Sequence, residues 1–335
     1  MRITQSMLTS NFLDNLTRSY DRLGKYQDQL ESGKKISRPS DDPVVAMNGI
    51  LYRTDVKEIE QYKNNINEVY VWMDNSDDVL DKTTQVLHRI RDLTEQASND
   101  TYEEKQRKDM AKEIEQLTDH IKDLFNTQIA GKYIFNGTDT TNPPIHRLDD
   151  GSYVVSTNNQ SFNIEVLPSI QIGVNVTATD MFPQTIDYQD PDYKAFIKDP
   201  TTGNQIPNPN PPVMKQSPQL FEMLGQLKET LTTRDANTGK PATGDEIGKY
   251  LAEITAHMDH LTAQRSELGA RMNRVQMIDD RLEEQEVSAK KMISDNEDVD
   301  YEKVIMNLKI QESIHRAALA VGARIIQPTL IDFLK

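Results

Sequence analysis

Histidines are the residues in this chain best suited to chemistry, because the sequence contains no cysteine. His257 and His260 lie three residues apart in a segment with helical spacing, and Glu253 precedes them by about one turn. Such a set can begin a metal site, but a zinc site needs further nitrogen or sulfur ligands. None approaches in the sequence, and Met258 and Leu261 already occupy the expected buried face. We therefore expect neither a metal site nor a bound cofactor.

Acidic side chains are the next candidates. The pair Asp41 and Asp42 could serve general acid–base catalysis, but neither a histidine nor a second acid pair adjoins it. Its place just before Pro43 favours helix capping instead. The acidic segment 295–300 lacks the glycine and the spaced oxygens of a calcium loop. Phosphate-binding glycine motifs and the GxSxG motif are also missing, so we expect no catalytic residues and no enzyme.

The composition of the chain limits the classes of partner that it can bind. The chain has 53 acidic and 38 basic residues and a net charge of −15, which opposes binding to nucleic acid or to an anionic membrane. No run of 18 apolar residues is present, and the first residues lack the apolar core of a cleavable signal peptide. Hydrophobic residues make up 36% and aromatic residues 6% of the chain. These low values suit long, thin helical layers better than a thick core.

The two ends of the chain carry the apolar residues that a partner could cover. Residues 3–30 and 305–326 each show one apolar stripe at helical spacing, and nothing beside them in the sequence covers it. Two such helices alone make a thin core, so we expect them to fold when neighbouring molecules cover their stripes. The residues expected to pack between subunits are Leu13, Leu16, Tyr20, Leu23, Leu30, Ile310, Ile314, Val321, Ile325, Leu330 and Leu334.

Long helices follow inside the two ends. Apolar residues recur every seven positions from Val45 to Leu87, which is the spacing of a coiled-coil seam. A second series lies three positions after members of the first, and Ser76 and Thr83 interrupt it. A second helix is expected around Ile114 and Ile121, and residues 247–293 step by alternating fours and threes. Ser217 and Pro218 resemble the start of another helix.

The middle of the chain changes character. Tyr133–Phe135, Tyr153–Val155 and the alternating segments at 162–166 and 170–176 predict a few short strands, and the proline-rich stretch 181–216 predicts an extended loop. The expected fold is mainly α: an elongated antiparallel helical bundle or coiled-coil rod with a small β-rich insert. We expect three parts, namely 1–42 with 295–335, 43–130 with 217–294, and 131–216.

Several motifs resemble one known family. MRIT at the start, LESGKKISRPSDDP at 30–43 and LTAQRSELGARMNRV at 261–275 are similar to the terminal regions of bacterial flagellins and their relatives. The ending ARIIQPTLIDFLK resembles the family's amphipathic C-terminus. GKYIFNGTDTTNPP at 131–144, PSDDP and LIDFLK favour the hook–filament junction members over the filament subunits.

The resemblance implies an extracellular structural protein of the flagellum, exported through the flagellar type III apparatus without a cleavable signal. The terminal helices would form an inner layer around a channel, and the insert would form an outer domain. The implied partners are further copies of the chain in a ring, the adjacent hook-associated junction protein, flagellin, and an export chaperone at the C-terminal helix. A filament subunit, or a soluble coiled-coil binding module of unrelated function, remains the alternative.

Overall fold

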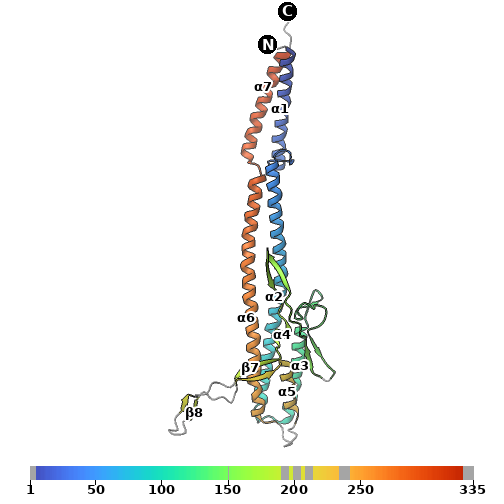
Figure 1. Ribbon diagram of the computed structural model, residues 1–335, viewed down its shortest axis with the longest axis vertical. Coiled ribbons are helices and arrows are strands. Elements are labelled where there is room, and N and C mark those ends of the chain that lie inside the picture. The colour runs from blue at the N-terminus through green and yellow to red at the C-terminus, as the bar shows by residue number, and fades with distance from the viewer. Residues whose placement is uncertain are drawn as a thin grey trace, which may run out of the picture. The chain divides into compact units, whose positions relative to one another are not determined.

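The computed structural model describes residues 5–149, 151–189, 196–198, 205–207, 214–233 and 242–326. Most of these residues are helical (Figure 1). The helices are α1 (Gln5–Ser32), α2 (Pro43–Ala97), α3 (Glu104–Phe125), α4 (Ala178–Met181), α5 (Leu220–Thr232), α6 (Gly244–Glu297) and α7 (Tyr301–Ile326). The strands are β1 (Gln128–Ile129), β2 (Lys132–Tyr133), β3 (Ile145–Arg147), β4 (Tyr153–Val155), β5 (Asn163–Leu167), β6 (Ile170–Gly173), β7 (Thr185–Gln189), β8 (Phe196–Lys198), β9 (Gln205–Pro207) and β10 (Met214–Pro218).

The predicted fold class is confirmed: long antiparallel helices with small β pieces inserted between them. The chain forms two compact units, residues 1–61 with 281–335 and residues 62–280. The boundary falls inside α2 and α6 rather than at 42/43 and 294/295. The three-part division expected from the sequence concerns layers of an assembly, so it stays a prediction.

Helix α1 ends at Ser32, just before a glycine in a left-handed conformation. Gly33 has a φ of +68°, a left-handed conformation that other residues adopt only with strain. The predicted cap of the next helix is also present, since the Asp42 Oδ1 accepts hydrogen bonds from the backbone N–H groups of Val44 and Val45, at 3.0 and 3.2 Å. These local signals set where α1 ends and α2 begins.

In the unit of residues 62–280, α2 and α6 pack antiparallel through the predicted seam. Members of the apolar series in α2 and of that in α6 are fully buried, as the 0% exposure of Ile66, Met73 and Val275 shows. Ser76 and Thr83, which interrupt the apolar series, are equally buried. Their hydroxyls donate to the carbonyls of Trp72 and Val79 at 2.8 and 2.7 Å, so they stay in the seam without an unsatisfied polar atom.

Aromatic rings join the insert to the helices of the same unit. Phe125 at the end of α3 packs on Phe135 and Phe182, with ring centroids 4.6 and 4.5 Å apart, and Phe182 contacts Phe221 of α5 at 5.1 Å. All four rings are buried. Burial of this cluster anchors the insert to α3 and α5.

Among the described residues, the short strands pair as five antiparallel ladders: β1–β2, β3–β4, β5–β6, β7–β10 and β8–β9. The strands expected around Tyr153 and Ile164 are present, but the expected strand Tyr133–Phe135 stops at Tyr133. Phe135 instead belongs to the buried aromatic cluster, and packing of its ring takes precedence over ladder pairing.

Two expectations for the proline-rich region were wrong. The stretch 181–216 is not one extended loop, because β7 near its start pairs with β10 at its end and β8 pairs with β9 between them. Ser217 and Pro218 do not begin a helix: they lie in β10 opposite Ile186 and Thr185, and α5 begins at Leu220. Pairing with β7 overrides the local capping preference of the Ser–Pro sequence.

Candidate interaction surface

Helices α1 and α7 lie side by side and antiparallel in the unit of residues 1–61 and 281–335 (Figure 1). On α1, six side chains with reduced exposure follow steps of four and three, which is the seam spacing of a two-helix coiled coil. They are Phe12, Leu16, Ser19, Leu23, Tyr26 and Leu30. On α7 the same spacing gives the inner face, which we define as Val304, Leu308, Gln311, His315, Ala318 and Gly322.

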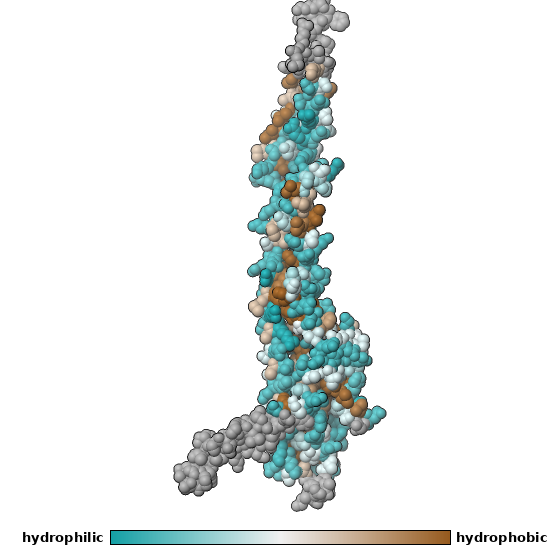
Figure 2. Space-filling model, in the orientation of Figure 1, coloured by the Kyte–Doolittle hydropathy of each residue, from teal (hydrophilic) through white to brown (hydrophobic). Residues whose placement is uncertain are grey.

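A second, more apolar face of α7 is exposed. We define this outer face as Met306, Ile310, Ile314 and Val321, whose side chains are 51–54% exposed. At about 100° per residue it lies roughly a third of the way around the helix from the inner face. Figure 2 shows apolar side chains reaching the surface among hydrophilic ones along the terminal helices. Exposed apolar residues in one stripe are typical of a surface that another molecule covers.

The first turns of α2 carry a further exposed apolar patch in the same unit. Val44, Met47, Ile50 and Leu51 are 57–65% exposed. Val45 and Gly49, on the opposite side of the helix, meet the end of α6: the Asn296 side chain donates to the Val45 carbonyl at 2.9 Å. The apolar patch therefore remains open to a neighbouring molecule.

The residues expected to pack between subunits fall into three groups. Leu13, Tyr20, Ile310, Ile314 and Val321 are 51–68% exposed, as such a role requires. Leu16, Leu23 and Leu30 are partly exposed and lie on the face of α1 that pairs with α7. Ile325 lies in α7, but its side chain, like all of Leu330 and Leu334, lies outside the described residues. Their packing between subunits stays a prediction.

A linker latch ties the α1–α2 turn to the α6–α7 break; we define it as residues 33–35 and 295–299. Lys34 and Asp298 form an antiparallel bridge, and the backbone N–H groups of Lys35 and Val299 donate to the carbonyls of Glu297 and Gly33 at 2.6 and 3.0 Å. The Lys34 ammonium contacts the Asp298 carboxylate at 2.7 Å. This hydrogen bond raises the pKa of Lys34 and lowers that of Asp298.

Glu297 anchors the linker latch from inside. Its side chain is 7% exposed, and its carboxylate accepts from the Arg53 guanidinium at 2.6 Å and lies 3.5 Å from the Lys34 ammonium. A Cβ added at Gly49 would lie 2.3 Å from its Oε1, so a side chain at position 49 would displace the carboxylate from its present place. The two cationic partners offset part of the free-energy cost of burying this carboxylate, a cost that an unpaired carboxylate would carry in full.

Sequence reasoning missed the linker latch as well as the polar and small residues at which α1 and α7 pair. Ser19, Gln311 and Gly322 interrupt the apolar stripes, so they carry no hydrophobic signal. Gly322 had one detectable sign, since glycine inside a helical pattern often marks close packing. The pairing of 33–35 with 295–299 joins segments more than 260 residues apart, and neither segment alone indicates it.

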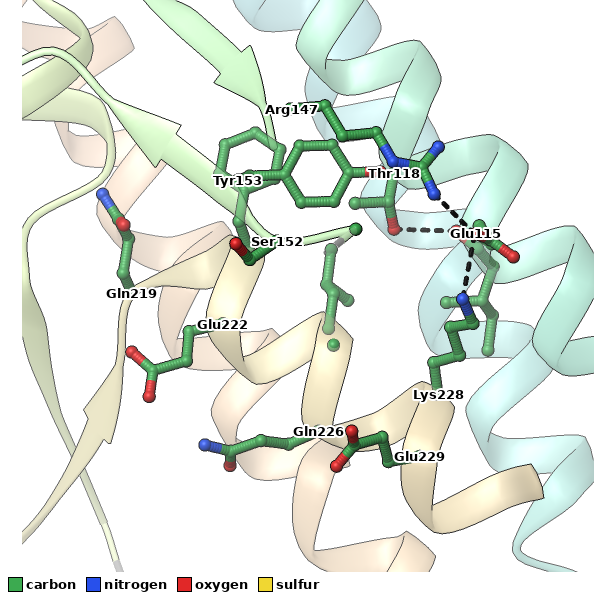
Figure 3. A pocket seen from close by; sticks show the side chains of 15 residues that line it. Glu115, Thr118, Arg147, Ser152, Tyr153, Gln219, Glu222, Gln226, Lys228 and Glu229 are labelled. Carbon is green, nitrogen blue, oxygen red and sulfur yellow. Dashed lines mark hydrogen bonds and ion pairs between the residues drawn. The ribbon is translucent and has the colours of Figure 1, made fainter. Parts of the chain in front are cut away.

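The unit of residues 62–280 contains a groove of about 520 Å³ between α3, α5 and the β3–β4 hairpin (Figure 3). At its rim, the Glu115 carboxylate pairs with Lys228 at 2.9 Å and with Arg147 at 2.8 Å. Lys228 and then Arg147 lower the pKa of Glu115. Tyr153 donates to Asp119 at 2.9 Å, and burial raises the pKa of its hydroxyl. These contacts hold the hairpin against α3 and α5.

The two histidines considered as metal ligands, His257 and His260, lie in other surroundings. His257 is buried, and the His260 Nε2 lies 2.7 Å from the backbone oxygen of Asp180. Within the described ranges, the structure brings together no group of three or more histidine or acidic side chains that could hold a metal ion. Of the helices described, none has the length and apolar character that a membrane span needs.

Comparison with known proteins gives the chain a family. The family model of the bacterial flagellin N-terminal helical region matches residues 3–140, and that of the bacterial flagellin C-terminal helical region matches residues 251–334. The two matches together cover well over half of the chain and include α1, α2, α3, most of α6 and all of α7.

Two relatives and one solved structure show how much of the chain is similar to known proteins. Flagellar hook-associated protein 3 of Escherichia coli is 24% identical over 321 residues, which are 95% of each chain. A flagellin of Bacillus subtilis is 27% identical over 182 residues, 52% of this chain and 56% of the flagellin. The crystal structure of the flagellar junction protein FlgL from Legionella pneumophila matches with a TM-score of 0.57 at 18% identity, covering 75% of this chain and all of that one. The shared terminal helical regions and the shared fold make this chain a member of the bacterial flagellin family.

Proposed function

We propose that this chain is a structural subunit of the flagellar hook–filament junction. One observation carries the proposal: the match to a hook-associated protein 3 extends over 95% of both chains, whereas the flagellin match covers about half of each. The chain is therefore similar to the junction protein in its insert as well as in its terminal helices. Similarity confined to the terminal helices would have suited any member of the family.

The function follows from contacts rather than from catalysis. The outer face of α7 and the apolar start of α2 lie on different elements, so one copy presents two unlike apolar surfaces. When two unlike surfaces meet between copies, the arrangement repeats head to tail and closes into a ring if the rotation allows. We propose that such a ring binds the adjacent hook-associated junction protein on one side and flagellin on the other.

Finer features are proposed from the family resemblance. Residues 1–42 and 295–335 form the inner layer and become ordered on assembly, residues 43–130 and 217–294 form the next layer, and residues 131–216 form the outer domain. The chain acts outside the cell, at the flagellum, after export through the flagellar type III apparatus without a cleavable signal. An export chaperone binds its C-terminal helix before assembly.

Deletion of the gene in the source bacterium tests the proposal. Electron microscopy of the cells and an assay of flagellin in the medium separate the possible outcomes. A junction subunit predicts bare hooks with flagellin monomers released into the medium, because filament subunits are exported but find no surface on which to grow. Expression of the intact chain from a plasmid should restore filaments.

Other results would contradict the proposal in distinguishable ways. Bare hooks without any flagellin in the medium would show that the chain is itself the filament subunit. Normal filaments and normal motility would remove both flagellar roles and favour a soluble coiled-coil module. The matched control is deletion of a gene outside the flagellar system, which should leave filaments unchanged.

A further inference from the structure

Helix α7 pairs with α1 through the less apolar of its two faces. The inner face includes Gln311, His315, Ala318 and Gly322, whereas the outer face is formed by Met, Ile and Val side chains with Ala317 between them. Burial of apolar area alone would favour the opposite arrangement, at roughly 25 cal/mol per Å² of apolar surface. Some specific contact must therefore select the inner face.

The first such contact joins Phe12 of α1 and Gly322 of α7. Gly322 is buried, and a Cβ added to it would lie 2.3 Å from the Phe12 Cζ and 2.4 Å from its Cε1. The edge of the phenyl ring therefore rests on the bare backbone of α7. A larger residue at 322 would collide with the ring, and only glycine lets the helices approach this closely.

The second contact is a buried polar pair in the middle of the same seam. The Gln311 side-chain amide donates to the Ser19 hydroxyl at 2.8 Å, and the two residues are 7% and 4% exposed. A slip of seven residues, the shortest that returns the same faces to each other, would place Gln311 opposite Phe12 or Tyr26. The Phe12 ring has no acceptor for the buried amide, and the only side-chain acceptor of Tyr26 is its hydroxyl, at the end of the ring farthest from the helix backbone. A buried unsatisfied polar group is costly.

We propose that Phe12–Gly322 and Ser19–Gln311 are specificity-determining contacts that select the inner face of α7 for pairing within the chain. They keep the outer face uncovered for another molecule. The polar pair excludes other registers, and the ring on the glycine excludes rotation of α7 onto its more apolar side. Only the identity of the molecule that later covers the outer face rests on the proposed function.

Two neighbouring alanines make the selection measurable. Ala317 lies among the outer-face residues and is exposed, whereas Ala318 is partly buried on the inner face. Because the chain has no cysteine, Ala317→Cys and Ala318→Cys each introduce a single reactive thiol. The experiment measures maleimide labelling rates of the full-length purified chain in trimethylamine N-oxide, which favours buried states. We expect Ala318→Cys to label about tenfold more slowly than Ala317→Cys.

Gly322→Leu should exchange the two rates, because its side chain blocks Phe12 and leaves the outer face as the better surface for α1. The matched control, Ala320→Leu, adds the same bulk at an exposed position off both faces and should leave the rates unchanged. Adding Phe12→Ala to Gly322→Leu makes room for the new side chain and should restore slow labelling at 318.

Three results would overturn the inference. Continued protection of position 318 in Gly322→Leu would show that the glycine does not select the face. Fast labelling at both positions in Gly322→Leu would show that the contact only stabilises the pair. Equal labelling at both positions in the otherwise unchanged chain, at a trimethylamine N-oxide concentration at which its helical circular dichroism has reached a plateau, would show that the inner face is not selected. The test needs no flagellum, so failure of the proposed function would leave its outcome unaffected.

Discussion

Asp139 holds the turn that follows β2, in the segment 131–144 whose sequence is similar to junction proteins. Its carboxylate accepts from the Asn142 side chain at 2.8 Å, from the Thr141 hydroxyl at 2.8 Å and from the Thr141 backbone N–H at 3.1 Å. Because these donors favour the charged form, they lower the pKa of Asp139 from 3.8 to about 2. The motif therefore has a structural role: it shapes a turn.

This shift predicts how acid affects the turn. The folded pKa lies below the unfolded one, so the carboxylate stabilises the turn above about pH 4, and this contribution is lost as the pH falls towards 2. NMR titration of the Asp139 carboxyl, assigned with Asp139→Asn, should give a midpoint near 2. Thr141→Ala should raise the midpoint, and Thr140→Ala, in the same loop, should not. A midpoint near 3.8 in the unaltered chain would contradict the turn geometry.

Single residues were predictable where the cause was local. The cap by Asp42 and the end of α1 at Gly33 follow from residue types and their order, because capping and left-handed backbone involve only a few neighbouring positions. Ser19 with Gln311, and Glu297 with Arg53, depend on partners more than 240 residues away. A polar residue in an apolar stripe looks like an interruption until its partner is known.

At the scale of elements, α6 depends on a seam whose members step by fours and threes. Leu268 lies in that seam and is 1% exposed, whereas Met277 on the same helix is 65% exposed. Leu268→Ala should lower the free energy of unfolding by about 2–5 kcal/mol through the lost burial and the cavity left behind. Met277→Ala should change it by less than about 0.5 kcal/mol.

Urea unfolding of both variants measures the difference. The slope against urea should stay the same as in the parent chain, so that the shift in midpoint reports stability alone. Losses of similar size in the two variants would mean that α6 does not pack through the predicted seam.

The long helices could be predicted because their signal repeats over many turns, and errors at single positions average out. The strands are two to five residues long, and their pairing is decided by distant segments. Ser217 and Pro218 show the limit: the local sequence favours a helix start, yet the partner strand β7 draws them into a ladder. Local propensity is a weak signal when it competes with tertiary pairing.

At the scale of the whole molecule, the sequence predicts the terminal helices as the surface for partners but does not indicate which face of each helix is free. The apolar stripe of α1 includes both Leu16, on the paired face, and the 51%-exposed Leu13. Helical periodicity reports that a face is apolar and not what covers it. Assigning each residue to the chain itself or to a neighbour required the positions of α1 and α7 together.

That assignment separates two substitutions that look alike in the sequence. Val321 is 54% exposed on the outer face, so Val321→Asp removes no buried contact within the chain. Circular dichroism and urea unfolding of the purified variant should therefore match the parent chain within about 0.5 kcal/mol. Leu16→Asp places a charge on the paired face of α1 and should disrupt its packing on α7 while leaving residues 62–280 folded.

Assembly should respond strongly to the change at Val321. If a neighbouring molecule covers the outer face, each copy would bury an unpaired carboxylate, at a cost of several kcal/mol. Val321→Asp expressed in the deletion strain should then restore neither filaments nor motility. Ala320→Asp adds the same charge one residue away, on a different side of the helix, and should restore both. Normal filaments with Val321→Asp would mean that the outer face stays exposed in the flagellum, because a charge there can be tolerated only in contact with water.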